Sequence, residues 1–247
     1  MDKNLNLVVL AGGRGKRMKS SLPKPLKKIG EKSMLQRIVK AGKELKPIRL
    51  VVVESNGRVK KAARRMECIT VRQKRPLGTA DALKVALGKC TADGNILVTC
   101  ADIPLISPRD LKELLLKHCR EDSYVTVLAA KVEDPSGYGR LVIEDGRVEK
   151  IVEEKEATPE EKNIDLVNSG IYCFKRKNLK KYLNMVEKSS VTGEYYLTDL
   201  VEIVINKDLD VHYEIGNRRQ VMGVNTPEQL EKAHNYLERL KEGKNNG

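Results

Sequence analysis

Runs of aliphatic residues alternate with segments of helical period along the first half of the chain. Apolar, largely β-branched runs span residues 5–10, 48–53, 69–71, 96–100 and 124–129. Segments 33–45, 57–66, 79–89 and 108–120 place apolar side chains along one helix face. The alternation predicts right-handed βαβ units, a mainly parallel sheet covered by helices on both faces, and ligands at the carboxyl ends of its strands.

The pattern changes after residue 130. Short strands are predicted at 140–143 and 147–152 around the turn signal Glu144-Asp145-Gly146, and another at 166–174. Thr226-Pro227 begins a last helix that reaches about Lys241, with a frayed tail at 242–247. We therefore predict one α/β domain over 1–228, with halves 1–130 and 131–228, followed by the C-terminal helix and tail at 229–247.

The segment LAGGRGKRMKSSLPK, residues 10–24, follows the first strand. Its glycines allow a ligand to approach the backbone closely, and its cations favour an anion such as a polyphosphate. The P-loop pattern does not fit, because Leu10 stands where its first glycine would be, and Lys16 and Arg17 interrupt the dinucleotide pattern. The basic residues of the segment are Arg14, Lys16, Arg17, Lys19 and Lys24.

Charge is distributed unevenly over the 247 residues, whose formal net charge is +13. Residues 1–76 carry 22 Lys and Arg against 5 Asp and Glu, and the rest carries 25 against 29. The basic excess therefore lies with the glycine-rich segment. A nucleic-acid partner is the weaker interpretation of this field, because one Phe and no Trp leave only the eight Tyr for stacking on bases.

The chain contains no apolar run of about 20 residues, and its N-terminus lacks a signal-peptide pattern. These features predict a cytoplasmic protein without a membrane partner. The cysteines occur singly, so they favour reduced thiols over a zinc site or a disulfide framework. Their positions are Cys68, Cys90, Cys100, Cys119 and Cys173.

Polar residues follow two more strands of the first half. Gln73 offers an amide suited to a pyrimidine edge, and Gly78-Thr79 opens a helix shortly after it. Asp102 follows the strand at 96–100, where a hard cation beside phosphates needs an oxygen ligand, and Asn225 could complete such a metal site. Taken alone, Gly78-Thr79 is better explained as a helix start. A helix cap is the competing explanation for Asp102, although Pro104 and Leu105 are not typical of a helix start.

Polar residues in the second half suggest a sugar site. In Asp134-Pro135-Ser136-Gly137-Tyr138-Gly139-Arg140, the backbone of Gly139 could approach a sugar ring. Glu153 ends the following strand, and Asn168 enters an apolar run, so both need hydrogen-bond partners that sugar hydroxyls would supply. The competing interpretation for each is a turn or an internally satisfied polar residue.

These motifs, in this order, closely resemble the uridylyltransferase domain of the bifunctional N-acetylglucosamine-1-phosphate uridylyltransferase family. The resemblance runs from Leu5 to about Leu230, through LAGGRGKRMKSSLPK, QKRPLGTA, ADIPLIS, DPSGYGRLVI, IVEEKEA, VNSGIY, GEYYLTDL and GVNTPEQL. It implies a Rossmann-like nucleotidyltransferase fold, with a nucleotide half at 1–130 and a sugar-binding half at 131–228. It also implies UTP and a sugar 1-phosphate as substrates, Mg²⁺ as cofactor, and a UDP-sugar and pyrophosphate as products.

Position by position, the resemblance also implies residue roles. Nucleotide binding falls to Leu10, Ala11, Gly12, Gly13, Gln73, Gly78 and Thr79. Arg17 and Lys24 neutralise the phosphates as the catalytic residues, and Asp102 and Asn225 bind the metal. The sugar-side positions are Cys100, Ala101, Gly139, Glu153, Asn168 and Asn225.

Three departures from the family pattern stand out. The family usually has a small hydroxyl residue where Lys16 stands, and an aromatic residue and glycine where Cys100 and Ala101 stand. No six-residue aliphatic period appears, so the resemblance does not extend to the β-helix acetyltransferase part of the bifunctional proteins.

The implied reaction is an in-line attack of the sugar phosphate on the α-phosphorus of UTP. A general base is not required, because the attacking oxygen is already ionised near neutral pH, and all three histidines lie outside the motifs. We predict UDP-N-acetylglucosamine as the product. One alternative is a related transferase that uses glucose 1-phosphate, CTP or TTP, and another is a non-catalytic nucleotide- or nucleic-acid-binding protein. Each of these interpretations is compatible with a homo-oligomer.

Overall fold

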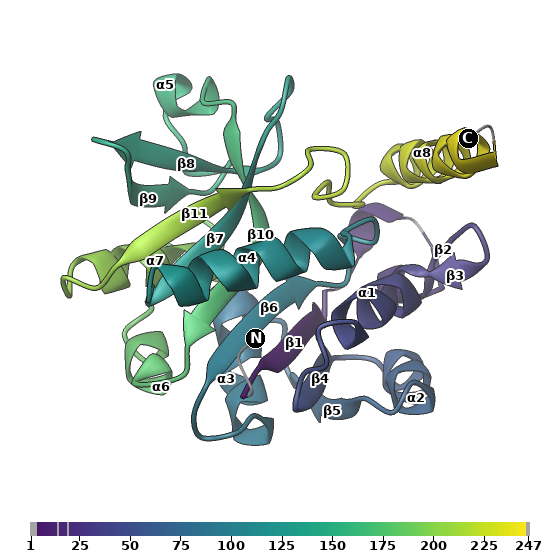
Figure 1. Ribbon diagram of the computed structural model, residues 1–247, viewed down its shortest axis with the longest axis horizontal. Helices are drawn as coiled ribbons and strands as arrows, with labels where there is room; N and C mark the ends of the chain where they lie inside the picture. The colour runs from purple at the N-terminus through teal and green to yellow at the C-terminus, as the bar shows by residue number, and fades with distance from the viewer. Residues whose placement is uncertain (1–3, 14, 19, 246–247) are drawn as a thin grey trace.

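A nine-stranded sheet runs through the computed structural model, which describes residues 4–13, 15–18 and 20–245 (Figure 1). Seven strands lie side by side in the order β11-β7-β10-β6-β1-β4-β5. All neighbours in this series are parallel except β10, which runs antiparallel to both β6 and β7. The bounds are β1 Asn6–Ala11, β4 Arg49–Glu54, β5 Ile69–Arg72, β6 Asn95–Cys100, β7 Val125–Lys131, β10 Leu166–Lys175 and β11 Val211–Ile215.

Helices cover both faces of the sheet, as the alternating pattern predicts, and each layer has its own apolar core (Figure 1). On one face pack α1 Met34–Lys43, α2 Gly57–Arg65 and α4 Pro108–Arg120. On the other pack α3 Thr79–Ala86, α6 Leu179–Leu183 and α7 Leu197–Ile205. Every strand and helix predicted for residues 5–129 is present, with ends that differ by up to three residues.

The predicted hairpin after residue 130 is also confirmed. Strands β8 Gly139–Glu144 and β9 Arg147–Val152 pair antiparallel. Asp145 and Gly146 between them have φ angles of 48° and 75°, the two positive values of the two-residue turn that matches strand twist. The hairpin joins the main sheet through β8, which pairs with the start of β10.

The second half of the chain shares the central sheet instead of forming a separate one, since β10 and β11 join the sheet on either side of β7. The sequence analysis missed several elements in that half and a small strand pair near the N-terminus. They are α5 Pro159–Lys162, α6, α7, β11, and the pair β2 Lys28–Ile29 and β3 Lys32–Ser33.

The last helix, α8 Pro227–Asn245, lies against β2 (Figure 1). Residues 242–245, expected as a tail, continue the helix, and residues 246–247 lie outside the described part of the chain. None of the described helices is both long and apolar enough to cross a bilayer. The five cysteines all lie in the described part of the chain, and none of them forms a disulfide.

Candidate active site

Two adjoining cavities open at the carboxyl ends of β1 and β6. The larger, of about 680 Å³, is here called the glycine-loop cleft, and the smaller, of about 250 Å³, the hairpin cleft. Arg17, Thr79, Cys100 and Asp102 line both. The two cavities therefore form one continuous site, in which a group bound in one meets a group bound in the other near Asp102.

The glycine loop is packed against the end of β4 and the residue after β5. Ser55 Oγ donates a hydrogen bond of 2.8 Å to the carbonyl oxygen of Gly12. A side chain at Gly12 would place its Cβ 2.9 Å from Gln73 Oε1, so a larger residue here would have to displace the buried Gln73 amide. The loop thus offers bare backbone to the cleft because its other side is already in contact with protein.

Gln73 is buried, and internal bonds determine which way its amide points. Its Nε2 donates to the carbonyl oxygen of Gly78 at 3.1 Å and to Asp81 Oδ2 at 2.8 Å. Both partners are acceptors, so the nitrogen must face them and Oε1 must face Gly12. The amide that the sequence assigned to a pyrimidine edge therefore presents an acceptor on the Gly12 side.

Gly78 brings a distant segment to the same cleft. Its φ is 109°, and a Cβ there would lie 2.3 Å from the carbonyl oxygen of Tyr195, so no other residue fits. Tyr195 in turn donates its N–H to the Leu77 carbonyl oxygen at 2.8 Å. This contact brings Thr192, Gly193 and Glu194 into the lining of the glycine-loop cleft.

The junction of the two cavities holds an ion pair. Lys24 Nζ donates to Asp102 Oδ2 at 2.6 Å and to Asn225 Oδ1 at 2.9 Å. The side chain of Lys24 is only 11% exposed and that of Asp102 is 25% exposed, so water screens the pair weakly. A backbone bond of 2.7 Å from Val224 N to Asp102 O holds the two oxygen-bearing residues together. One ammonium thus occupies the position between two oxygen ligands that suit a hard cation.

The hairpin cleft contains a carboxylate in an unfavourable environment for charge. Burial raises the pKa of Glu153, and Thr198 Oγ1, which donates to Glu153 Oε1 at 3.1 Å, offsets part of the rise. Burial and the nearby Glu156 also raise the pKa of Asp199 to about 6. A neutral ligand that donates hydrogen bonds would stabilise the ionised carboxylate, whereas an anionic ligand would add a repelling charge.

Asn168 and Cys100 form another part of the hairpin cleft. Asn168 Nδ2 donates to the Tyr172 hydroxyl at 2.6 Å, and its Oδ1 accepts from Gly170 N at 2.9 Å, so this residue is partly satisfied internally. The Cys100 thiol lies 3.9 Å from the Gly170 carbonyl oxygen. Burial and the neighbouring Asp102 raise the pKa of Cys100, which keeps the thiol protonated and makes it a wall of the cavity, not a nucleophile.

The glycine-rich turn before β8 is held by a buried arginine. Arg140 is 1% exposed and donates to Glu154 Oε2 at 2.5 Å and to the carbonyl oxygen of Tyr138. This pair joins the turn at Gly139 to the end of β9, where Glu153 lies. A buried arginine requires such partners. The arginine that follows the glycines in the motif could therefore have indicated this ion pair from the sequence.

A protein-family model described as "Nucleotidyl transferase" matches residues 6–239. The chain belongs to the nucleotidyl transferase family. Among curated relatives, the "Bifunctional protein GlmU" of Clostridioides difficile (strain 630) is 38% identical over 240 residues, which are 96% of this chain and 52% of that protein. The protein of the same name from Pelotomaculum thermopropionicum (strain DSM 13744 / JCM 10971 / SI) is 42% identical over 243 residues, with the same coverage. The chain spans about half the length of these relatives.

Solved structures show the same fold. A UDP-glucose pyrophosphorylase complexed with UDP-glucose superposes with a TM-score of 0.75 at 20% identity, over 95% of this chain and 98% of the other. A CMP:2-keto-3-deoxy-manno-octonic acid synthetase complexed with CTP gives a TM-score of 0.71 at 21% identity, over 96% and 99%. At these identities the likeness establishes the nucleotidyltransferase architecture alone.

Most of the residues singled out in the sequence of this nucleotidyl transferase meet in the two cavities. Ala101 lines the glycine-loop cleft instead of the hairpin cleft, because its N–H bonds Leu10 O and its side chain is buried. Arg14 and Lys19 lie outside the described residues, as does the side chain of Lys16. The glycine-loop cleft contains Leu10, Ala11, Gly12, Gly13, Arg17, Lys24, Gln73, Gly78, Thr79 and Asp102, and the hairpin cleft contains Gly139, Glu153, Asn168 and Asn225.

Proposed function

We propose that this chain is a uridylyltransferase that makes UDP-N-acetylglucosamine and pyrophosphate from UTP and N-acetylglucosamine 1-phosphate. The observation that carries the proposal is the junction at Asp102, where a cationic cleft under a glycine loop meets a carboxylate-lined cavity. Family membership supports nucleotidyl transfer, and the sequence resemblance supports the choice of sugar. The triphosphate would lie along the glycine loop, and the sugar would lie beneath the β8–β9 hairpin.

The position of Lys24 supports a divalent cation at the junction. Its ammonium lies between Asp102 Oδ2 and Asn225 Oδ1, which shows that these two oxygens accommodate a cation. One carboxylate and one amide oxygen, completed by substrate phosphates and water, match the coordination that Mg²⁺ prefers. Mg²⁺ held there would neutralise charge on the phosphates of both substrates. Lys24 would then exchange its contact with Asp102 for one with phosphate oxygens.

The remaining chemistry is positioning and charge neutralisation. An ionised oxygen of the sugar phosphate forms a bond to the α-phosphorus of UTP, and the bond from that phosphorus to the bridging oxygen breaks and releases pyrophosphate. Arg17 lines both cavities, so its guanidinium can contact either phosphate group. A general base has no proton to remove, which agrees with the absence of histidine from the described lining of both cavities.

Gln73 supports a uracil over a cytosine base. Its Nε2 is committed to Asp81 and Gly78, so only Oε1 is available to a nucleotide. Uracil carries an N–H at N3 that can donate to this oxygen, whereas N3 of cytosine is an acceptor and cytosine could donate only from its exocyclic amino group. A mismatch that leaves a buried polar group unpaired costs about 1–3 kcal/mol.

The deciding experiment measures pyrophosphate release with UTP, TTP or CTP, each combined with N-acetylglucosamine 1-phosphate or glucose 1-phosphate. We expect a higher kcat/KM with UTP than with CTP. We also expect kcat/KM for N-acetylglucosamine 1-phosphate to exceed that for glucose 1-phosphate by at least about tenfold. In Gln73→Ala, the preference for UTP over CTP should shrink. Equal or better turnover of glucose 1-phosphate would instead assign the chain to the related glucose 1-phosphate transferases, and no release with any pair would exclude catalysis.

A further inference from the structure

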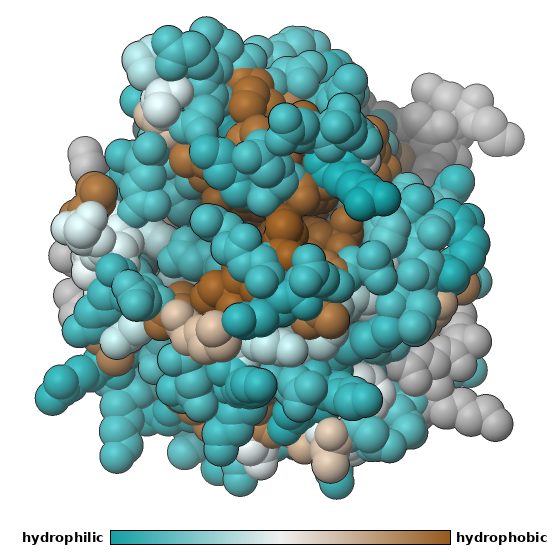
Figure 2. All heavy atoms as spheres, turned by 90° about the vertical axis from the view of Figure 1, so that its left-hand side faces the viewer, coloured by the Kyte–Doolittle hydropathy of each residue, from teal (hydrophilic) through white to brown (hydrophobic). Residues whose placement is uncertain are grey.

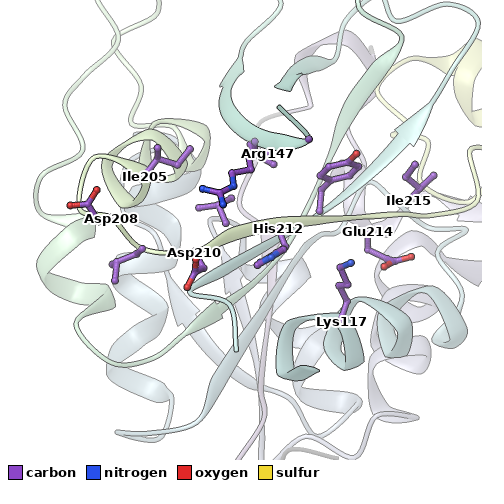
Figure 3. Close-up of a pocket in the computed structure, with 13 residues that line it drawn as sticks. Lys117, Arg147, Ile205, Asp208, Asp210, His212, Glu214 and Ile215 are labelled. Carbon is purple, nitrogen blue, oxygen red and sulfur yellow. The ribbon is translucent and has the colours of Figure 1, made fainter. Parts of the chain in front are cut away.

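The free edge of the sheet at β11 forms a groove that the proposed reaction does not use. It encloses about 760 Å³, and its lining shares no residue with the two clefts of the site. Lys117 of α4 borders the groove on one side of β11, and Arg147 at the start of β9 borders it on the other (Figure 3). The left-hand side of Figure 1 holds these elements, and Figure 2 shows hydrophobic atoms at the centre of that face between hydrophilic ones. The apolar lining comes from Val148, Ile205, Leu209, Val211 and Ile215.

The backbone of β11 has unpaired groups along this groove. The carbonyl oxygen of Asp210 accepts from Val125 N, and Gly216 N donates to the carbonyl oxygen of Ala129, so residues of even number face β7 in the parallel ladder. The N–H and C=O groups of Val211, Tyr213 and Ile215 therefore point the other way. Among the described residues no strand pairs with that side of β11. Such an edge is a template for another strand.

We propose that β11 pairs with β11 of a second copy of this chain, antiparallel about a two-fold axis through Tyr213. Each outward-facing residue would then donate one backbone hydrogen bond and accept one, Val211 opposite Ile215 of the second copy and Tyr213 opposite its own equivalent. On that face the pairs are aliphatic with aliphatic and aromatic with aromatic, combinations that stabilise antiparallel strands. The half-exposed Ile215 would become covered.

The polar side chains of β11 select this register. With the axis at Tyr213, His212 lies opposite Glu214 of the second copy, and Glu214 lies opposite its His212. Ser123 Oγ lies 2.8 Å from His212 Nδ1, and when the hydroxyl donates to that nitrogen, Nε2 carries the hydrogen and can donate to the carboxylate. Moving the axis by one residue would place His212 opposite His212 or Glu214 opposite Glu214, which is unfavourable.

The opposite edge of the sheet lacks this self-complementarity. Strand β5 ends at Arg72, and the neighbouring helix α2 carries basic side chains, so two copies meeting there would bring like charges together. At β11 both signs are present: Glu214 lies on the strand, and Arg147 and Lys117, whose Nζ is 3.6 Å from Glu121 Oε1, border the same groove (Figure 3). The charge pattern therefore favours self-association at β11 and disfavours it at β5.

The test is the mass of the full chain by light scattering and sedimentation over a range of concentrations. A short strand pair buries little area, so we expect a reversible dimer with a dissociation constant on the order of 10 µM. Glu214→Lys places Lys opposite His212, and His212→Glu places Glu opposite Glu214; each should weaken the dimer about tenfold. The double variant His212→Glu with Glu214→Lys places opposite charges across from each other and should restore the dimer. The control Glu44→Lys reverses an exposed charge directly after α1 and should leave the dimer unchanged.

Hydrogen exchange gives an independent readout. The amides of Val211, Tyr213 and Ile215 should become protected as the protein concentration rises, while residues of β5 keep their exchange rates. A monomer at every concentration would overturn the proposal, as would a dimer that neither single reversal weakens. None of these residues lies in the proposed substrate clefts, so failure here would leave the proposed reaction standing, and loss of the reaction would leave the dimer standing.

Discussion

The two walls of the site are built from opposite chemistry. The glycine-loop wall presents backbone and cations, with Lys24 almost enclosed between two oxygens. The hairpin wall presents the carboxylate of Glu153, and burial raises the pKa of Glu153 and of the nearby Asp199 behind it. The difference indicates which part of each substrate belongs where: phosphates suit the cationic wall, and uncharged hydroxyl groups suit the carboxylates, which require donors.

The walls also differ in how the chain forms them. Residues 10–24 supply most of the cationic wall from one continuous segment after β1. The carboxylate wall combines the β8–β9 hairpin, β10 and α7. Substitutions on the two walls should therefore act on different substrates, and the following experiments test that separation.

The largest effect should come from Asp102, which lies where the walls meet. Asp102→Ala removes the carboxylate proposed to hold Mg²⁺ and leaves Lys24 without its anionic partner. We expect the rate of pyrophosphate release to fall by about 10³-fold, with the circular dichroism spectrum unchanged. Asp93→Ala, at an exposed position, serves as the control and should keep full activity. Normal turnover of the Asp102 variant in EDTA would contradict the assignment.

Lys24→Ala should have the next largest effect. That effect should come only from lost contacts with the phosphates. The ammonium acts in a nearly enclosed site, so its loss should lower kcat by about 10²-fold. Lys61→Ala and Lys60→Ala on α2 remove equal charges from the surface, where salt screens interactions beyond about 10 Å, and should change the rate little. The measurement is the initial rate of each variant at moderate salt. If either α2 variant loses as much rate as Lys24→Ala, the net positive charge of this half, and not the position of Lys24, determines the rate.

Glu153→Gln tests the carboxylate wall and should affect only the sugar phosphate. The variant keeps an oxygen near Thr198 but weakens acceptance from hydroxyl groups, so the KM for the sugar 1-phosphate should rise about tenfold. The KM for UTP should stay unchanged, as should both constants in the control Glu149→Gln on β9. If both KM values rise together, the two walls do not bind separate substrates.

The smallest effect should appear in the free energy of unfolding and concerns Asp199, which lies near Glu153 of the carboxylate wall. The pKa of Asp199 is raised from 3.8 to about 6 in the folded protein, so the folded state binds a proton more readily than the unfolded state. Stability is therefore lost as pH rises from about 4 through about 6. After allowance for solvent screening of this half-buried group, Asp199→Asn should gain about 1 kcal/mol at pH 7 and nothing at pH 4 in urea unfolding. The control Asp165→Asn, at an exposed position, should change the free energy of unfolding at neither pH. If Asp199→Asn stabilises the protein equally at pH 7 and pH 4, the raised pKa of Asp199 is not the cause of the gain.

Local pattern alone was enough for the order of elements over residues 5–129 and for the hairpin at 139–152. In that region apolar runs alternate with amphipathic segments, and Asp145-Gly146 supports its turn through backbone preference. The glycine loop, Lys24 and Gln73 were also found from sequence, because each follows a recognisable strand. Short elements such as α6 and β11 escaped, since their residues are held by tertiary packing and β11 pairs with a strand 86 residues earlier in the chain.

The sequence by itself determined the residue types of the site and the family resemblance that orders them. Only the tertiary structure decided that Lys24 lies between Asp102 and Asn225, that the Gln73 oxygen faces Gly12, and that the segment around Tyr195 closes over Gly78. It likewise decided which edge of the sheet stays unpaired. The physical reason is that a strand or turn depends on neighbouring residues, whereas an ion pair, an amide orientation and a free edge depend on which distant segments the folded chain brings together.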